Sequence, residues 1–121
     1  MTIRSKRVYD PPSSDDGFRV LIDGLWPRGV SHERAAIDLW ARELAPSDEL
    51  RRWYGHEPAR FEEFSRRYRA ELQGQRERLA ELRRHARSGG VTIVFAARDA
   101  DHSNATVLVD VLGRGLRGES R

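Results

Sequence analysis

The residues that decide the fold are Val91-Thr-Ile-Val-Phe-Ala-Ala97, which follow the glycine pair Gly89-Gly90. Only the threonine in this run is polar, and polar residues follow it. A short apolar run of this kind predicts a strand buried on both faces, as in a parallel sheet covered by helices. The glycine pair before the run is a typical stop signal for a preceding helix.

Two further strands are predicted upstream. Residues 3–9 carry several cations, which suits a strand with one face in water, and residues 18–25 are rich in β-forming side chains. The intervening segment 10–17 consists of Asp, Pro, Ser and Gly, which favour a loop. Because this loop is short for a helical crossover, the first strand either runs antiparallel to the second or returns through an irregular connection.

Helices are predicted on both sides of the buried strand. Ser47 is a good N-cap for a helix over residues 48–54. An apolar stripe at helical spacing then runs from residue 58 to residue 86, and Gly74 within it either breaks the helix or only weakens it. A last helix is predicted over residues 105–116. The order helix, buried strand, helix predicts an α/β fold with a small, mainly parallel sheet of about three strands packed by helices.

Length and composition predict one small soluble domain. The 121 residues have room for a single hydrophobic core, so we expect one domain over residues 1–121, with residues 117–121 as a frayed tail. The chain has no cysteine, which excludes disulfides, thiol nucleophiles and cysteine-based zinc sites. The absence of a signal-peptide pattern and of a long apolar run predicts a cytoplasmic location and no membrane partner.

The positive charge is spread along the chain. The formal net charge is +3, and residues 1–30, 31–90 and 91–121 contribute +1, +2 and 0 to it. No segment forms a basic tail or stripe, so binding to nucleic acid is an alternative that the sequence does not favour.

Polar side chains follow two of the predicted strands. Trp26-Pro27-Arg28-Gly29 ends the second strand, and residues 98–104 follow the third. Ligands collect beyond the carboxyl ends of parallel strands, so these two segments form the predicted site. We expect Arg28 and Arg98 to hold an anion, with Asp23 and Asp99 orienting the two arginines.

The start of the last helix completes the predicted site. Its first backbone N–H groups, around residues 103–106, would face the same anion, and His102 would move a proton if chemistry occurs. In the alternative interpretation, Asp101 or Ser103 only caps the helix and Arg98 pairs with Asp99. The predicted catalytic residues are therefore His102 and Asp99, and the predicted ligand-binding residues are Lys6, Asp23, Trp26, Arg28, Arg98, Ser103 and Asn104. Asp23 is expected to pair with Lys6, Arg7 or Arg28.

Metal ions are weaker candidates, and no cofactor is predicted. Asp99 and Asp101, joined by Asp23 or Asp10, suggest a magnesium site, but acids are common in such loops and the signal is weak. The four histidines lack paired ligand spacing, which argues against zinc. The leading hypothesis is a protein that binds, and in one version acts on, a small anionic or nucleotide-like ligand. The alternatives are a non-enzymatic partner-binding or nucleic-acid-associated protein and a magnesium-dependent phosphodiesterase or nuclease.

Several motifs carry a family resemblance that covers nearly the whole chain. They are residues 6–10, 16–23, 25–29, 45–47, 50–51, 53–54 with His56, 64–68, 71–72, 97–99 with His102, 104–105 and 107–108. With these motifs the chain resembles the YeaO-like branch of the domain of unknown function 488 family, and Leu25-Trp-Pro-Arg-Gly29 is the most specific of them. The resemblance implies a small α/β fold and assigns no activity or cofactor. Members of that family usually carry an arginine where this chain has Gly24.

Overall fold

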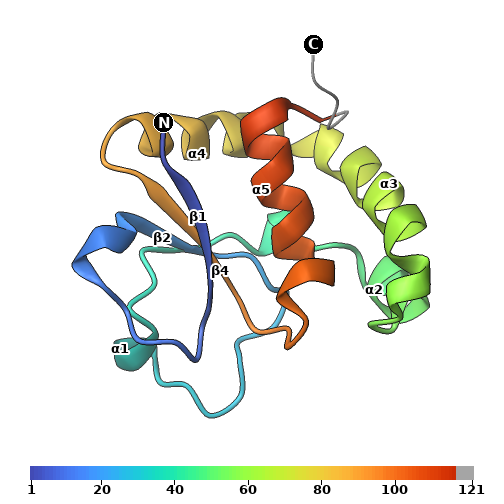
Figure 1. Cartoon of the computed structure of the whole chain (residues 1–121), viewed down its shortest axis with the longest axis horizontal. Coiled ribbons are helices and arrows are strands. Elements are labelled where there is room, and N and C mark those ends of the chain that lie inside the picture. The colour runs from blue at the N-terminus through green and yellow to red at the C-terminus, as the bar shows by residue number, and fades with distance from the viewer. Residues whose placement is uncertain (117–121) are drawn as a thin grey trace.

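The computed structural model describes residues 1–116 as one parallel sheet with helices packed against it (Figure 1). The strands are β1 (Ile3–Arg7), β2 (Phe18–Leu21), β3 (Leu39–Trp40) and β4 (Val91–Phe95). Their order across the sheet is β1-β4-β2-β3, and every pairing is parallel. The predicted fold class is confirmed, and the sheet has four strands where about three were expected. The tail predicted over residues 117–121 lies outside the described residues.

The central strand β4 occupies the position that the sequence predicts for a buried strand. All five of its residues are buried, and it pairs with β1 on one side and with β2 on the other. In this register Val94 lies between Lys6 of β1 and Leu21 of β2. Strands β1 and β2 are therefore not hydrogen-bonded to each other. Of the two alternatives for the first strand, the irregular return is the one observed, because both strands are parallel to β4.

The region after β2 contains two short elements that were not predicted from the sequence, α1 (His32–Ala35) and β3. Helix α1 spans a single turn, and β3 has only two residues, so neither gives a periodic signal. Strand β3 is fixed to β2 by backbone hydrogen bonds, from Asp38 N–H to Arg19 O and from Ala41 N–H to Leu21 O. The second strand also ends at Leu21. Asp23 therefore lies beyond the strand and not within it.

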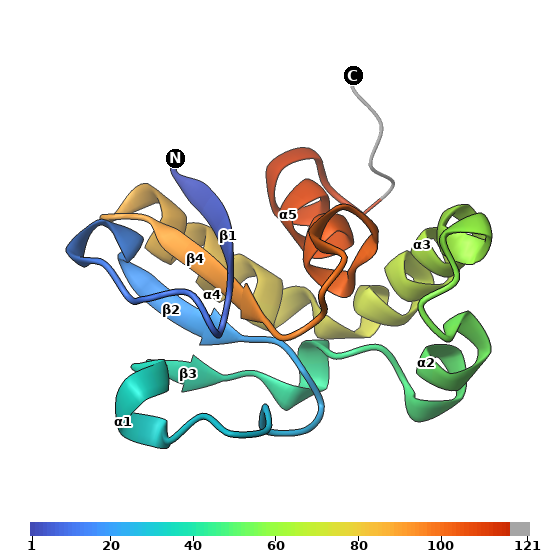
Figure 2. The same cartoon turned by 60° about the horizontal axis from the view of Figure 1, so that its bottom comes forward.

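The larger helices form the second layer of the fold. They are α2 (Asp48–Tyr54), α3 (Phe61–Leu72), α4 (Arg76–Arg87) and α5 (Asn104–Arg114), and their apolar side chains share one core with Val20, Ile93 and Phe95 of the sheet. The 3-10 turn η4 (Gln73–Gln75) separates α3 from α4, so Gly74 lies at a break in the helix. Figure 2 shows α1 at the end of the sheet far from α3. Among the described residues, no helix is long and apolar enough to cross a membrane.

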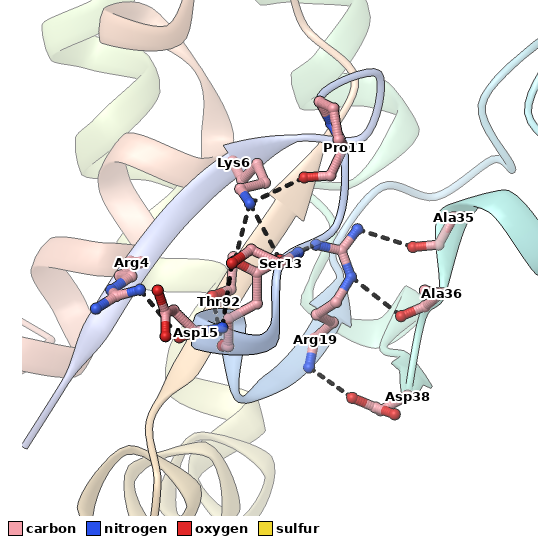
Figure 3. Close-up of polar contacts among 11 residues, drawn as sticks. Arg4, Lys6, Pro11, Ser13, Asp15, Arg19, Ala35, Ala36, Asp38 and Thr92 are labelled. Carbon is pink, nitrogen blue, oxygen red and sulfur yellow. Dashed lines mark hydrogen bonds and ion pairs between the residues drawn. The ribbon is translucent and has the colours of Figure 1, made fainter.

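The opposite face of the sheet carries a buried ionic cluster of Lys6, Asp16 and Arg19 (Figure 3). Asp16 is only 3% exposed and lies in the 3-10 turn η1 (Ser14–Asp16). Its carboxylate accepts hydrogen bonds from Lys6 Nζ at 2.9 Å and from Arg19 Nη1 at 2.5 Å. The Arg19 guanidinium also donates to the carbonyl groups of Ala35 and Ala36 at the end of α1. The cluster therefore ties the first loop to β1, β2 and α1.

The charge state of Asp16 follows from these contacts. Burial by itself raises the pKa of this carboxyl, but hydrogen bonds from Lys6, from Ser13 N–H and from Arg19 outweigh burial and lower the pKa below 3.8. A depressed pKa in the folded state means that the ionised carboxylate stabilises the fold at neutral pH. That contribution is lost as the pH falls through the folded-state pKa, below 3.8.

We expect Asp16→Asn to lower the free energy of unfolding by about 3 to 5 kcal/mol, because it leaves the buried Arg19 and the partly buried Lys6 without their shared anion. Urea unfolding at pH 7 measures this loss. Asp15→Asn is the matched control, since the neighbouring Asp15 side chain is exposed and forms no ion pair within residues 1–116. Equal unfolding midpoints for the two variants would contradict a stabilising role for the cluster.

Candidate functional site at the carboxyl edge of the sheet

The carboxyl ends of β1, β4 and β2 lie side by side at one edge of the sheet. Beyond the strands, Val8 N–H donates to Phe95 O at 2.7 Å and Ile22 N–H donates to Val94 O at 3.2 Å. From this edge the chain leaves β4 toward α5, on the face of the larger helices, whereas it leaves β1 toward the ionic cluster on the opposite face. Connections that diverge in this way open a crevice in α/β sheets, and ligands bind at such points.

Arg7 and Tyr9 connect the two segments that the sequence analysis singled out. The Arg7 guanidinium donates from Nε to Ala97 O at 2.9 Å and from Nη2 to Ala96 O at 3.2 Å. The same guanidinium lies over the Tyr9 ring, with 5.0 Å between its Cζ and the ring centroid. The Tyr9 hydroxyl donates to Arg28 O at 3.2 Å. This series of contacts brings the Arg28 loop and the residue before Arg98 to the same place.

We call the group of Arg7, Tyr9, Arg28 and Arg98 the arginine edge. The side chains of Arg28 and Arg98 are exposed, and neither guanidinium forms a hydrogen bond or ion pair within residues 1–116. Arg7, in contrast, is half-buried and bound to backbone carbonyls. Within residues 1–116 the arginine edge thus has two guanidinium groups without a polar partner and one, that of Arg7, fixed to the scaffold.

Trp26 has a structural role in this region. Its indole Nε1 donates to Val30 O at 2.7 Å, and its ring stacks on His32 with 3.9 Å between centroids. Trp40 meets the same ring edge-on and donates from Nε1 to Asp23 O. The turn from Asp23 to Val30 is therefore held rigidly, and Trp26 anchors it.

Asp23 has different partners from those expected. Its carboxylate accepts a hydrogen bond from Ala96 N–H at 2.9 Å and one from the Asn104 amide at 3.3 Å, and Asn104 also donates to Ile22 O. The expectation that it pairs with Lys6, Arg7 or Arg28 was wrong, because Lys6 binds Asp16 and Arg7 binds carbonyl groups. Burial raises the pKa of Asp23 despite the hydrogen bonds from Asn104 and Ala96. Asp23 and Asn104 together join the tips of β2 and β4 to α5.

Asp99 and His102 form a pair beside the arginine edge. His102 Nδ1 lies 2.8 Å from Asp99 Oδ2, and Asp99 Oδ1 accepts from the backbone N–H groups of Asp101 and His102. The hydrogen bond with His102 lowers the pKa of Asp99. Phe61 contacts the imidazole edge-on, and the Tyr54 hydroxyl donates to His102 O at 2.5 Å. An imidazole held by a carboxylate can transfer protons, and here the carboxylate also caps the turn η5 (Ala100–His102).

Ser103 caps the last helix. Its hydroxyl accepts from Thr106 N–H at 3.4 Å, and Thr106 closes a reciprocal capping box. This contact agrees with the alternative interpretation of Ser103, and it leaves fewer free N–H groups for an anion than expected. The other half of that interpretation is not observed, since no Arg98–Asp99 ion pair occurs within residues 1–116.

Lys6 lies apart from the other predicted residues. Its ammonium group donates to both carboxylate oxygens of Asp16 and to Pro11 O, on the face of the sheet that carries the ionic cluster. The sequence analysis missed Arg7 as a member of the site, and it missed Tyr9 and Tyr54. Arg7 and Tyr9 stand at the end of the first strand, so the rule applied to the other two strand ends would have found them. No cluster of three metal-ligating side chains occurs in the described part of the chain.

Comparison with known proteins identifies relatives over nearly the whole chain. A family model described as the inactive DUF488-N3 subclade matches residues 2–120. The uncharacterised protein Rv3073c of Mycobacterium tuberculosis is 44% identical over 110 residues, which cover 91% of this chain and 92% of that protein. The uncharacterised protein YeaO of Escherichia coli is 38% identical over 115 residues, which cover 93% and 97% of the two chains. No solved structure matches the chain.

The position of Gly24 has room for a side chain. A Cβ atom there would meet only Ala45 Cβ, at 3.7 Å, and Gly24 does not have a positive φ. Gly17 is different, because it has a φ of +66° and its Cβ would lie 2.9 Å from Gly89 O.

We therefore expect Gly24→Arg to change the free energy of unfolding by less than about 0.5 kcal/mol, as for an exposed site without strain. Gly17→Ala should destabilise by more than about 1 kcal/mol, because it combines a disfavoured backbone conformation with a steric clash. Chemical denaturation of both variants tests the pair. A Gly24→Arg protein as unstable as Gly17→Ala would show that the strand tip cannot accept the arginine that the family resemblance implies there.

Proposed function

We propose that this chain, which belongs to the YeaO-like DUF488 family and within it to the inactive DUF488-N3 subclade, binds a small anionic ligand at the arginine edge without chemically converting it. The observation that carries the proposal is the pair Arg28 and Arg98. Both guanidinium groups are exposed, and neither has a polar partner within residues 1–116. They stand on loops that follow two neighbouring parallel strands.

The surroundings of the two arginines support anion binding. Arg7 adds a third positive charge at the same edge, while the nearby Asp99 is already paired with His102. Guanidinium groups bind phosphate and carboxylate groups through two parallel hydrogen bonds, which gives them an advantage over lysine for such ligands. The rigid Trp26 turn would keep the Arg28 loop in one conformation before and after binding.

Binding of the ligand without chemical conversion agrees with the designation of the DUF488-N3 subclade as inactive. The Asp99 carboxylate is committed to two backbone N–H groups as well as to the His102 ring, so a helix-capping role explains this pair without catalysis. The catalytic role of His102 and Asp99 stays a prediction from the sequence.

The contacts of the helical arginines argue against the alternative function of nucleic-acid binding. Arg66 and Arg67 both pair with Glu63, Arg69 pairs with Asp110, and Arg78 lies between Glu43 and Glu81. These pairs neutralise much of the positive charge on the helices. A polyanion would gain little by displacing counterions from such a surface.

We expect pyrophosphate to raise the melting temperature of the wild-type protein, because a ligand that binds only the folded state stabilises it by mass action. At a ligand concentration of 100 Kd the stabilisation is about 2.7 kcal/mol. The rise should vanish in Arg28→Ala and in Arg98→Ala. Arg52→Ala is the matched control, since this exposed arginine on α2 has no hydrogen bond or ion pair in the described chain and should leave the rise unchanged.

The anions to compare in this thermal-shift experiment are phosphate, pyrophosphate and di- and tricarboxylates, each at constant ionic strength. A rise of equal size in the wild type and in both edge variants would place the anion elsewhere and refute the proposal. The absence of any rise with every anion would also refute it.

We expect no product when the protein is incubated with nucleotides or phosphate esters and the mixture is followed by phosphorus NMR. His102→Gln should retain the thermal shift with pyrophosphate, because His102 lies outside the arginine edge. Product formation that is lost in His102→Gln would instead assign proton transfer to the Asp99–His102 pair and overturn the claim that binding occurs without conversion.

A further inference from the structure

Two exposed apolar side chains stand on the loops that form the arginine edge. Among the described residues, the large hydrophobic side chains that stand exposed are Met1, Tyr9 and Leu25, with exposed fractions of 63%, 47% and 73%. Met1 is the first residue of the chain, whereas Tyr9 and Leu25 belong to the loops that follow β1 and β2. An exposed aromatic ring next to free cations therefore occurs at the site already described.

The Tyr9 ring is fixed in position although nearly half of its surface is open. Its hydroxyl is bound to Arg28 O at 3.2 Å, and the Arg7 guanidinium lies over the ring with 5.0 Å between Cζ and the centroid. Arg7 is in turn held by two carbonyl groups of the β4 tip. No other Phe, Trp or Tyr side chain in residues 1–116 is as exposed. The ring is thus a flat surface held by two contacts, which lowers the entropy cost of ordering it on binding.

Leu25 is also presented by a rigid segment. The next two residues are held in place, since Trp26 is bound to Val30 O and stacked on His32, and Pro27 is buried. The backbone of a leucine in such a turn needs no further ordering when an apolar group covers its side chain. Its exposure makes it a suitable contact for the uncharged part of a ligand.

We propose that the ligand of the arginine edge is a nucleotide, whose base stacks on Tyr9 near Leu25 and whose phosphate groups lie on Arg28 and Arg98. This inference rests on the proposed anion site and adds the base. A simple phosphate or carboxylate would use the arginines and leave the ring uncovered. A single strand of nucleic acid would need successive stacking surfaces along its path, and the edge provides one ring.

Isothermal titration calorimetry with pyrophosphate, ADP and UDP tests this inference. ADP should bind at least about tenfold more tightly than pyrophosphate, which corresponds to 1.4 kcal/mol, within the range measured for a base stacked on an aromatic ring. UDP should fall between the two, because its ring is smaller. In Tyr9→Leu the affinity for ADP should fall to that for pyrophosphate.

Tyr9→Phe is the matched variant, because it keeps the flat ring and loses only the hydroxyl that binds Arg28 O. It should retain the preference for ADP over pyrophosphate. Melting temperatures of both variants establish that they are folded, so that a lost preference in Tyr9→Leu reports on the ring itself.

The possible outcomes separate this inference from the anion site. Equal affinities for pyrophosphate and ADP would overturn the nucleotide and leave the anion site intact. No binding of either compound would refute both. A preference for ADP that survives Tyr9→Leu would show that the base lies elsewhere, and an affinity that rises with oligonucleotide length would identify a polymer in place of a nucleotide.

Discussion

Strand β4 can lie between β1 and β2 only if those two strands stand one strand apart. The rest of the structure depends on the contacts that hold β1 and β2 at this separation. Lys6 of β1 and Arg19 of β2 both bind Asp16, whose backbone carbonyl accepts a hydrogen bond from Thr92 of β4 at 2.6 Å. One buried carboxylate therefore joins the two strands that flank β4 across the face of β4. Replacement of such a group by an apolar side chain would leave the buried Arg19 and the partly buried Lys6 without an anion.

The candidate site follows from the same arrangement. Because β4 lies between β1 and β2, its tip is a neighbour of both of theirs, and loops of different origin meet there. At this edge the side chains of Asp23, Asn104 and Trp26 stabilise the loops by hydrogen bonds to backbone groups. Those left for a ligand are the two free guanidinium groups and the exposed face of Tyr9. Scaffold and binding surface are thus formed largely by different residues of the same loops, and Tyr9 contributes to both, through its hydroxyl and its ring.

The sequence predicts the layers of this fold better than it predicts the contacts of its polar groups. An apolar run such as that of β4 and a capped helix such as α2 are local signals, and both elements occur where expected. Strand β3 has two residues and depends on its partner, so no local pattern marks it. Lys6 and Arg7 are adjacent cations in one strand, and alternation sends them to opposite faces of the sheet. Lys6 therefore meets Asp16, and Arg7 meets the carbonyl groups at the tip of β4. These partners come from segments distant in sequence, so the sequence of the strand does not reveal them. For this reason the predicted site included Lys6 where the structure has Arg7.

The position of β4 also determines when the chain can fold during synthesis. Ile3 pairs with Val91 and Arg7 with Phe95, so strands near opposite ends of the chain must meet before the sheet closes. Contacts between such distant residues slow folding, because a long loop has to be closed before they form. Until a ribosome has released residues 91–95, β1 and β2 each lack a partner on the side that β4 will occupy. The nascent chain therefore leaves one edge of β1 and one edge of β2 without a partner during that interval, and the cations of β1 oppose pairing with other chains at its edge.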